Sequence, residues 1–328
     1  MTYDEAKIAF TALFEAKMPN DAMRELLVSM RLDENTSVGA IAAAAEVMRS
    51  HAIALPISET LRKECIDIVG TGGDKIGSFN ISSTVSILAS ACGSFVAKHG
   101  SRSVTSKSGS ADMYEALGVR LDLSIQKSAK LLEESGFTFM FAQNHHPAMK
   151  FIMPVRKTIH DKTIFNILGP LSNPAGVRKS LLGVFSSSFV PKMAEALKIN
   201  GAQSTMVVSS KEHMDEISIS DITYASQLHN GVVLEFEIDP QMYGIKKAPL
   251  SAIVGGDAKE NAKTLYAIFD GTATDAQRDI VLINTAAALI IDDKARDFQD
   301  GLEMAREAIK NHKAKEKLKQ IIEISNKL

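Results

Sequence analysis

Cysteine is scarce in this sequence: only two cysteines occur among 328 residues, and both lie in apolar segments. Cys65 opens a β-branched run and Cys92 follows a run of small apolar residues, so both are expected to be buried free thiols. This pattern excludes a disulfide framework and favours a reducing compartment. No apolar stretch reaches the ~20 residues of a membrane-spanning helix, and the first residues lack the basic start and apolar run of a signal peptide. We therefore expect a cytoplasmic protein that does not bind membranes.

The sequence also lacks an excess of basic residues. Lys and Arg total 37 against 39 for Asp and Glu, so no overall positive field draws the chain to nucleic acid. There is no repeat of fixed period and no low-complexity segment. Hydrophobic residues make up 45% of the chain, which allows a full core and excludes extensive disorder. A length of 328 residues allows one large domain or two unequal ones.

The two standard phosphate-binding motifs are absent, although the segment Ile66–Ser83 has the character of a phosphate loop. It reads IDIVGTGGDKIGSFNISS: a β-branched strand, four glycines within eight residues, and a hydroxyl-rich helix start. The dinucleotide pattern fails because Lys75 stands where its third glycine belongs, and the Walker pattern fails at Ser78 and Phe79. A tight turn before a capped helix is the alternative. We favour a phosphate or pyrophosphate site, because glycines let backbone N–H groups approach an oxyanion and a helix N-terminus attracts it.

A second polar loop follows the predicted strand 93–97. The segment Lys98–Asp112 carries three cations, six hydroxyl side chains and two glycines. A solvated surface loop could have this composition. Its place at the carboxyl end of a strand favours a second phosphate-binding loop, since ligands of open α/β sheets bind at those ends and cations and hydroxyl groups suit phosphate.

Three further candidates lie beyond these loops. The adjacent acids Asp215 and Glu216 follow a predicted strand, and they are either solvated charge or hard oxygen ligands that bring Mg²⁺ to a diphosphate. The pair His145 and His146 lacks a nearby third ligand, so we expect a polar wall beside a substrate pocket and no zinc. Arg156 adds a cation on a helix close behind.

The pattern of secondary structure changes at Cys65. Residues 1–64 read as helices only, whereas strands and helices alternate from Cys65 onward, which predicts an α/β fold with a mostly parallel sheet. The alanine run Ala42–Ala45 allows the close approach of another helix, either within the chain or from a second subunit.

Taken together, these motifs resemble those of the anthranilate phosphoribosyltransferase family. They occur in the family's order and with similar spacing over nearly the whole chain. The matching segments are Gly70–Asp74, Ser78–Ser83, Lys98–Asp112, His146–Lys150, Pro154–Arg156, Thr163–Pro174 and the pair Asp215 and Glu216.

The resemblance implies a reaction, a fold and partners. The family transfers a phosphoribosyl group from phosphoribosyl pyrophosphate to the amino group of anthranilate, in a Mg²⁺-dependent step of tryptophan biosynthesis. Its fold is of the nucleoside phosphorylase and phosphoribosyltransferase type. It joins a small all-helical domain, here 1–64 with 156–178, to a large α/β domain with a mostly parallel sheet, here 65–155 with 179–328. A homodimer formed through the helical parts is expected, and a glutamine amidotransferase is a candidate partner.

The resemblance also implies binding residues within these motifs. Two Mg²⁺ ions per subunit are expected, with the ligands Ser82, Asp215 and Glu216. The residues expected to bind anthranilate are Gly70, Ser101, His146 and Arg156. The residues expected to bind phosphoribosyl pyrophosphate are Gly70, Gly73, Asp74, Ser78, Asn80, Ile81, Ser82, Ser83, Lys98, His99, Gly100, Ser101, Arg102, Ser103, Val104, Thr105, Ser106 and Ser110. No general base is expected, because the amine of anthranilate is a neutral nucleophile at neutral pH.

Four positions depart from the family pattern: Ser101 replaces an Asn, Gln143 a Pro, His160 a Gly and Lys162 an Arg. They leave the expected donor site intact and put the affinity for the acceptor in question. Two alternatives remain beside the main interpretation. A pyrimidine nucleoside phosphorylase shares the architecture and would use free phosphate and a nucleoside. A non-enzymatic nucleic-acid-binding relative is the other, and the near-neutral charge argues against it.

Overall fold

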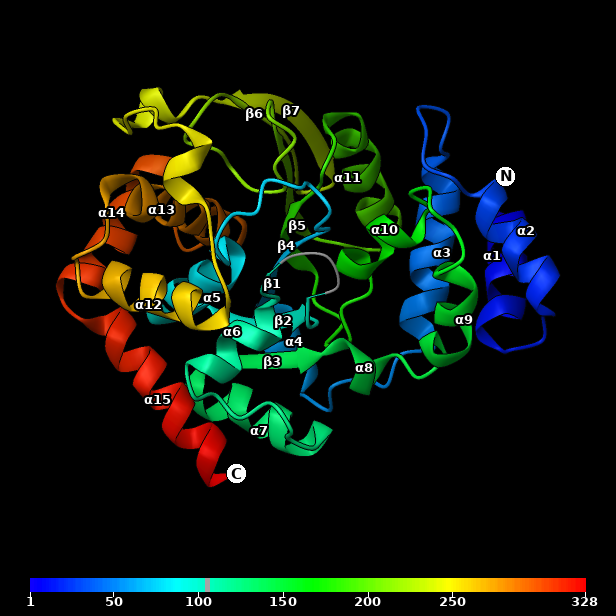
Figure 1. Cartoon of the computed structure of the whole chain (residues 1–328), viewed down its shortest axis with the longest axis horizontal. Coiled ribbons are helices and arrows are strands. Elements are labelled where there is room, and N and C mark those ends of the chain that lie inside the picture. The colour runs from blue at the N-terminus through cyan, green and yellow to red at the C-terminus, as the bar shows by residue number, and fades with distance from the viewer. Residues whose placement is uncertain (104–106) are drawn as a thin grey trace.

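A seven-stranded sheet lies at the centre of the computed structural model, which describes residues 1–103 and 107–328 (Figure 1). The strands are β1 (Cys65–Gly70), β2 (Phe95–Gly100), β3 (Phe137–Phe141), β4 (Lys179–Gly183), β5 (Ser204–Ser210), β6 (Thr223–His229) and β7 (Val232–Ile238). Their order is β3-β2-β1-β4-β5-β6-β7, in which β1 to β5 run parallel and β6 and β7 are antiparallel. The predicted mostly parallel sheet is confirmed.

The order of the strands places a topological switch point beside β1. From β1 the chain moves outward through β2 to β3, and it then returns to the other side of β1 to form β4 and β5. Gly70 and Gly183 are paired at the carboxyl ends of β1 and β4. Ligands of open α/β sheets bind outside the strand ends at such a point, so the sheet order alone directs attention to the loops that follow β1 and β2.

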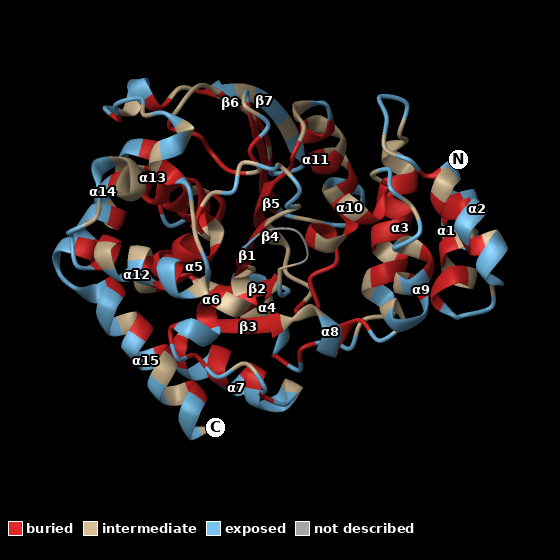
Figure 2. Cartoon of the chain, in the orientation of Figure 1, coloured by how far each residue is buried: buried red, intermediate tan, exposed pale blue. Residues whose placement is uncertain are grey.

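One face of the sheet is covered by helices from the middle and the end of the chain (Figure 1). Helix α5 lies against β1, β2 and β3, and α13, α14 and α15 pack on α5. Figure 2 shows α5 and α13 largely in red, because their apolar side chains belong to one buried cluster. The helices of this layer are α5 (Ile81–Ala91), α6 (Ser110–Ala116), α12 (Ala258–Phe269), α13 (Asp275–Ile291), α14 (Phe298–Lys310) and α15 (Lys313–Lys327).

The N-terminal helices cover part of the other face. Helix α11 packs on β5 and β6, α3 packs on α11, and α1 packs on α3. A second buried apolar cluster extends from these helices to Val69, Leu182 and Val207 of the sheet. The helices on this side are α1 (Tyr3–Phe14), α2 (Asn20–Ser29), α3 (Val38–Ser50), α9 (Met149–Arg156), α10 (Phe165–Leu168) and α11 (Val190–Ile199).

Shorter elements complete the fold. Helix α7 packs on β2 and β3, and a third buried cluster joins it to Cys65 of β1 and Ala97 of β2. The remaining α-helices are α4 (Glu59–Glu64), α7 (Ile125–Ser135) and α8 (Ala142–His145), and the 3₁₀ helices are Gly169–Leu171, Ser187–Phe189, Pro240–Tyr243 and Leu250–Ile253. Among the described residues, no helix has the length and apolar character that crossing a membrane requires.

The alanine run of α3 is used within the chain. Every side chain from Ala42 to Ala45 is 0% exposed, and the Asn200 amide, at the end of α11, donates to the Ala42 carbonyl at 3.0 Å. Small side chains allow α1 and α11 to approach α3 closely. Of the two possibilities left open by the sequence, packing within the chain is therefore confirmed for this run.

Candidate active site

The segment 71–80, called the glycine loop here, connects the carboxyl end of β1 to the N-terminus of α5. Gly72 and Gly73 have φ angles of +66° and +76°, a conformation that side chains disfavour. Gly70 is required for a different reason, since a Cβ atom there would lie 2.2 Å from Asp215 Oδ2. Asn80 precedes α5 without capping it through its side chain. The predicted arrangement of strand, glycine loop and open helix N-terminus is confirmed.

The acids Asp215 and Glu216 contact this loop and the start of α5. Asp215 Oδ2 accepts a hydrogen bond from the Gly72 N–H at 2.7 Å. Glu216 Oε1 accepts from the Ser82 N–H at 3.0 Å and also from the Ser82 hydroxyl. Two acids that lie more than 130 residues from the glycine loop in the sequence therefore contact both the loop and the first turn of α5.

Burial and neighbouring negative charge raise the pKa of both acids. The pKa of Asp215 is raised first by burial and then by Asp74, whose side chain also hydrogen-bonds to it, and that of Glu216 by burial and then by Asp215. Adjacent buried carboxylates repel each other unless a cation lies between or beside them. A bound cation would therefore stabilise the charged form of this pair.

The oxygen atoms of this pair fit Mg²⁺. Mg²⁺ prefers hard oxygen ligands and is commonly held by one or two carboxylates together with substrate phosphates and water. The described residues contain no group of three or more His, Cys, Asp or Glu side chains arranged to hold a metal. Asp215, Glu216 and the Ser82 hydroxyl could therefore supply part of a Mg²⁺ coordination shell, and phosphate or water oxygens would have to supply the rest.

The second predicted loop begins beneath the glycine loop. Alternation along β2 sends Lys98 toward the face covered by α5 and His99 toward the opposite face. The Lys98 ammonium group is buried and donates to the Ile68 carbonyl, and burial lowers its pKa. Three negative side chains raise the same pKa: Asp67, Glu216 and Asp215. Lys98 is therefore a buried countercharge to the acids that lies under the loop.

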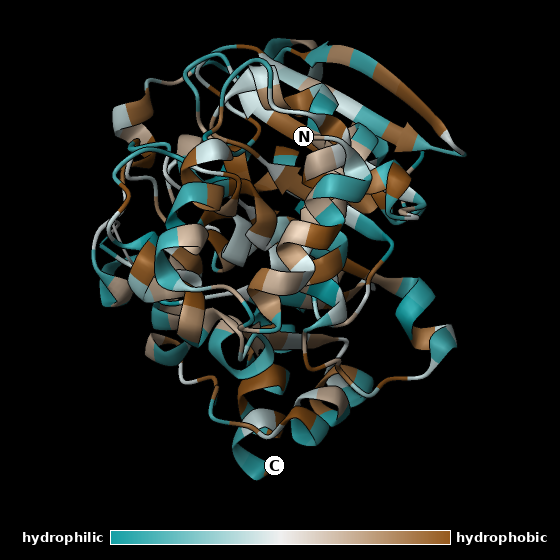
Figure 3. Ribbon diagram, turned by 90° about the vertical axis from the view of Figure 1, so that its right-hand side faces the viewer, coloured by the Kyte–Doolittle hydropathy of each residue, from teal (hydrophilic) through white to brown (hydrophobic). Residues whose placement is uncertain are grey.

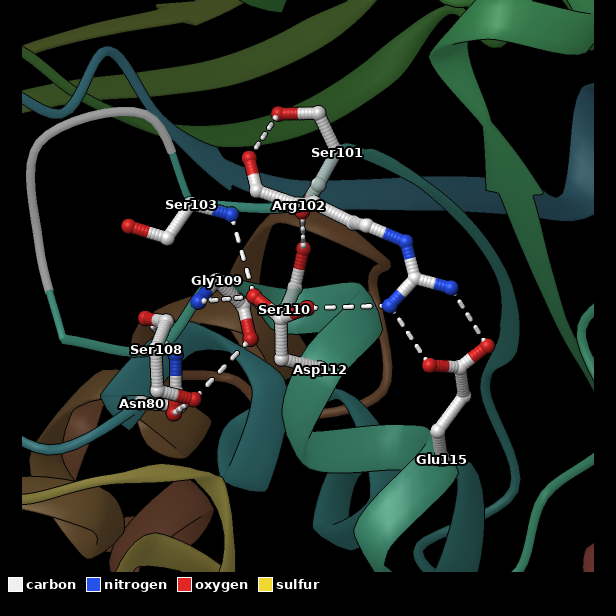
Figure 4. A network of polar contacts seen from close by, with 9 residues as sticks. All are labelled: Asn80, Ser101, Arg102, Ser103, Ser108, Gly109, Ser110, Asp112 and Glu115. Carbon is white, nitrogen blue, oxygen red and sulfur yellow. Dashed lines mark hydrogen bonds and ion pairs between the residues drawn. The ribbon is translucent and has the colours of Figure 1, made fainter.

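Arg102 is engaged within the chain. Its guanidinium group donates to Asp112 at 3.0 Å and to both carboxylate oxygens of Glu115 at 2.6 Å, as Figure 4 shows. The N–H groups of Ser103 and Gly109 also donate to Asp112, at 3.0 and 2.8 Å. Asp112 thus accepts hydrogen bonds from both ends of the loop. The predicted residues Val104, Thr105 and Ser106 lie outside the described residues.

Asn80 joins the two loops. Its amide donates to the Ser108 carbonyl at 3.2 Å, and the Ser108 hydroxyl donates to Asn80 Oδ1 at 3.2 Å (Figure 4). Asn261, on α12, donates to the same Asn80 oxygen at 2.8 Å. Our interpretation of the sequence did not include Asn261, because nothing local marks an Asn on a late helix as a neighbour of the glycine loop.

Two predicted residues at the start of α5 are buried. Ile81 is 1% exposed and Ser83 is 2% exposed, and the Ser83 carbonyl accepts from the Tyr114 hydroxyl at 3.0 Å. Their side chains face the core, so only their backbone groups are available to a ligand. Ser78, by contrast, is partly exposed and pairs with Val254 in an isolated bridge, a contact that the sequence did not suggest.

Two histidines lie together on the opposite face of β2. The rings of His99 and His146 are 5.1 Å apart, and both side chains are 4% exposed. Among the described residues, His99 Nε2 and both ring nitrogens of His146 have no hydrogen-bond partner. Burial lowers the pKa of His146 to about 4, so its ring is neutral at pH 7. Buried polar atoms are almost always bonded to protein, water or ligand, so this pair is a candidate contact for a ligand.

Arg156 differs from Arg102 in its surroundings. It lies at the end of α9 with its guanidinium carbon 5.7 Å from the centre of the Phe165 ring, and its one recorded polar contact is Met153 Sδ at 4.0 Å. No carboxylate in the described part of the chain forms an ion pair with it. Burial lowers its pKa. A largely buried cation without an acidic partner is suited to binding an anion.

Lys162 connects the segment after α9 to the glycine loop. Its ammonium group donates to the Gly73 carbonyl at 3.1 Å and lies 3.2 Å from the centre of the Phe185 ring. The two other departures outside the loops lie elsewhere: Gln143 is exposed on α8, and His160 is exposed between α9 and α10. Of these three departures, Lys162 is the one with a recorded contact to the glycine loop.

Known proteins resemble this chain along its whole length. A family model described as "Glycosyl transferase family, a/b domain" matches residues 62–315. The anthranilate phosphoribosyltransferase of Rhodopseudomonas palustris (strain TIE-1) is 42% identical over 325 residues, which cover 99% of this chain and 94% of that protein.

Solved structures show the same relationship in three dimensions. The anthranilate phosphoribosyltransferase of Thermus thermophilus has a TM-score of 0.92 at 35% identity, covering 99% of this chain and 96% of that one. The Saccharomyces cerevisiae enzyme in complex with PRPP and Mg has a TM-score of 0.86 at 27% identity, with 99% and 93% coverage. The yeast enzyme in complex with 4-fluoroanthranilate has a TM-score of 0.85 at 26% identity, with 99% and 92% coverage.

Proposed function

This chain belongs to the anthranilate phosphoribosyltransferase family, and from that premise we propose how its residues carry out the reaction. The phosphoribosyl group passes from phosphoribosyl pyrophosphate to the amino group of anthranilate. The bond between C1 of the ribose and pyrophosphate breaks, a bond from the amine nitrogen to C1 forms, and the amine loses a proton to solvent. The observation that carries this assignment is the contact of Asp215 and Glu216 with both the glycine loop and α5.

We propose that the glycine loop and the loop after β2 hold the pyrophosphate and ribose of the donor. The backbone N–H groups around Gly73 and the first turn of α5 supply uncharged donors at the positive end of the helix dipole. Asp112 and Asn80 hold the two loops in place before the donor arrives. Arg102 can contribute to the donor site through its backbone, or through its guanidinium group if the donor displaces Glu115.

We propose that Ser82, Asp215 and Glu216 bind Mg²⁺, with two ions per subunit. A bound ion would neutralise the charge that develops on the leaving pyrophosphate. Lys98 compensates part of the charge of the acids from below, and Asp74 lies within hydrogen-bond reach of Asp215. The two acids therefore lie close together at the strand ends, where a bound cation would stabilise their charged forms.

We propose that Arg156 binds the carboxylate of anthranilate and that His146 lines its path, with Gly70 and Ser101 as further contacts. Arg156 has no competing acid in the described part of the chain, so a charge-assisted bond to the acceptor would not have to displace an internal one. The neutral His146 ring can donate to or accept from the acceptor without repelling it. The reaction needs no general base, because the aromatic amine attacks in its neutral form, and orientation and electrostatic stabilisation supply the rate.

We further propose the division of the chain into a helical domain, 1–64 with 156–178, and an α/β domain, 65–155 with 179–328. The contacts of α9 with α1 and α2 favour counting α9 with the helical domain as well. We propose a homodimer formed through the helical domain. Ile8 of α1 and Phe151 of α9 are 73% and 57% exposed there, and Figure 3, which faces this side, shows apolar segments among the polar ones.

Two proposals concern the setting of the enzyme. Cys65 and Cys92 are unpaired, as is usual in a reducing compartment, and this supports a cytoplasmic location. Association with a glutamine amidotransferase remains a prediction from the family resemblance.

The activity can be tested directly by fluorescence. Anthranilate fluorescence should fall when phosphoribosyl pyrophosphate and Mg²⁺ are both present, and the absence of tryptophan from the chain keeps the protein background low. Omission of either the donor or Mg²⁺ is the control. A constant signal at all concentrations of both substrates would contradict the proposed function.

A further inference from the structure

A cavity of about 360 Å³ lies at the amino-terminal edge of β4 and β5, at the opposite end of these strands from the glycine loop. Arg178, which precedes β4, and Arg49, in the last turn of α3, both line it. The apolar part of its wall consists of Pro170, Leu171, Val177, Leu197 and Ala202. Among the described residues, none that is proposed to bind donor, acceptor or Mg²⁺ lines this cavity.

Arg49 brings a poorly compensated positive charge to the cavity. Burial lowers the pKa of Arg49, the charge of Glu46 raises it in part, and the nearby Arg178 lowers it. One N–H group of Arg49 donates to the carbonyl of Asn200 at 3.3 Å. Asn200 is the C-cap residue of α11. Glu46, on the same helix, forms its ion pair with Lys7 at 3.1 Å and compensates Arg49 only in part, without a direct ion pair. A guanidinium group has five N–H donors, so the recorded contact leaves most of them available.

Arg178 is only partly neutralised. Glu59 lies 3.5 Å from Arg178 Nη2 and 3.2 Å from Arg62 Nε, so one carboxylate is shared between two guanidinium groups. Arg62 lies beside the lining residue Gly176, since its Nη1 donates to the neighbouring Ala175 carbonyl at 2.8 Å. Among the described residues, Glu59 is the one acid that forms ion pairs with Arg62 and Arg178, and no acid forms one with Arg49, so the local charge is positive.

A buried hydroxyl group adds a directional donor. Ser180 lies in β4, lines the cavity and is 5% exposed. Its Oγ atom has no hydrogen-bond partner among the described residues. Buried polar atoms without a partner are rare in folded proteins, and an acceptor oxygen in the cavity would satisfy this one.

We propose that this cavity binds a small organic carboxylate that carries an apolar body. The carboxylate would accept hydrogen bonds from Arg49, Arg178 and Ser180, since partly buried cations are stabilised by a paired anion. The apolar body would lie against Leu171 and Leu197. The volume is near the lower end of the roughly 300–1,000 Å³ that is usual for small-molecule sites. The proposal does not depend on the reaction at the other end of the strands.

Methyl NMR of the full chain tests this proposal with cyclohexanecarboxylate as the probe and cyclohexanecarboxamide as its neutral counterpart. The methyl signals of Leu171, Val177 and Leu197 should shift in a saturable way with the carboxylate. The carboxamide should bind at least about tenfold more weakly, because it cannot form charge-assisted hydrogen bonds.

Variants decide whether the arginines are responsible. Arg49→Leu should weaken binding of the carboxylate by about tenfold or more. If Arg49→Leu does not fold, Arg178→Leu should show the same loss of affinity. Arg24→Leu, which removes an exposed arginine of α2, is the matched control and should bind as the unchanged chain does. The proposal is overturned if the cavity methyl signals do not move, if carboxylate and carboxamide bind equally, or if neither cavity variant weakens binding.

Discussion

The donor side and the acceptor side of the site differ in how far the chain satisfies its own polar groups. On the donor side, Asp215, Glu216 and Arg102 are all hydrogen-bonded within the chain. On the acceptor side, the ring nitrogens of His146 and the guanidinium group of Arg156 have no polar N or O partner among the described residues.

This difference teaches how each ligand is recognised. A phosphate loop that is already organised needs little rearrangement when a highly charged donor binds, which favours electrostatic stabilisation of the transition state. The acceptor is small and carries a single carboxylate. Buried groups that lack a partner discriminate strongly between ligands that can satisfy them and ligands that cannot. The donor side is therefore expected to supply rate, and the acceptor side to supply specificity.

Replacing both acids, Asp215→Asn with Glu216→Gln, should give the largest effect. The double variant loses the proposed Mg²⁺ ligands, and losing stabilisation of developing charge typically lowers kcat about 10²–10³-fold. Folding should survive, because the amides keep the shape and remove two like charges. The measurement is anthranilate consumption over a range of Mg²⁺ concentrations, with thermal unfolding in parallel. Asp221→Asn, a neighbouring acid that pairs with Lys211 at 3.1 Å, is the control. An unchanged Mg²⁺ dependence in the double variant would exclude these acids as ligands.

His146 should make the protein sensitive to acid. Its pKa is about 4 when folded against an ordinary value of 6.5, so between these values the unfolded chain binds a proton that the folded chain does not. The free energy of unfolding should therefore fall as the pH drops from 6.5 to 4, by about 3 kcal/mol from this group. Asp67 opposes this trend, since burial raises its pKa to about 6 and its contribution is lost as the pH rises through that value.

The variant His146→Gln isolates the contribution of this ring, because Asp67 is present in both proteins. Urea unfolding at pH 7, 5.5 and 4 should show a smaller loss of stability in the variant than in the unchanged chain. Equal losses of stability in the two proteins would mean that His146 is solvated or hydrogen-bonded in the folded protein. The acceptor side would then be less different from the donor side in how far its polar groups are satisfied.

Arg156→Met should raise the KM for anthranilate about tenfold to a hundredfold, the usual effect of losing a charge-assisted hydrogen bond. The KM for phosphoribosyl pyrophosphate should stay within a factor of about two, and Arg156→Lys should recover part of the affinity. Arg31→Met, at an exposed arginine paired with Asp161 at 2.8 Å, is the control. If the donor KM rises instead, Arg156 belongs to the donor side.

Ser101→Asn should have the smallest effect. This change restores the residue of the family pattern at the start of the second loop, where the Ser101 hydroxyl now donates to the Arg102 carbonyl at 3.0 Å. A longer side chain that reaches the acceptor should lower the KM for anthranilate by about threefold to tenfold, the value of one neutral hydrogen bond. Steady-state kinetics at saturating donor measure it. An unchanged or higher KM would show that position 101 does not touch the acceptor.

Much of the fold and of the donor site could be predicted from local patterns. Strands alternating with helices after Cys65 indicated the parallel sheet, and the glycines with the hydroxyl-rich start of α5 indicated an anion site. The acids Asp215 and Glu216 could be read as solvated charge or as metal ligands until the fold placed them over Gly72 and Ser82. Asn261 and Val254 could not be found, because their contacts to the loop join segments far apart in the chain.

By itself the sequence determined which segments form strands, helices and anion-binding turns, since periodicity, glycine and capping residues act over a few neighbouring positions. Only the tertiary structure decided which polar groups are paired. It turned Arg102 toward Asp112 and Glu115, left Arg156 without an acid, and placed Arg49 and Arg178 around a cavity at the far edge of the sheet. The physical reason is that burial and charge pairing depend on distances across the fold, which no local pattern specifies.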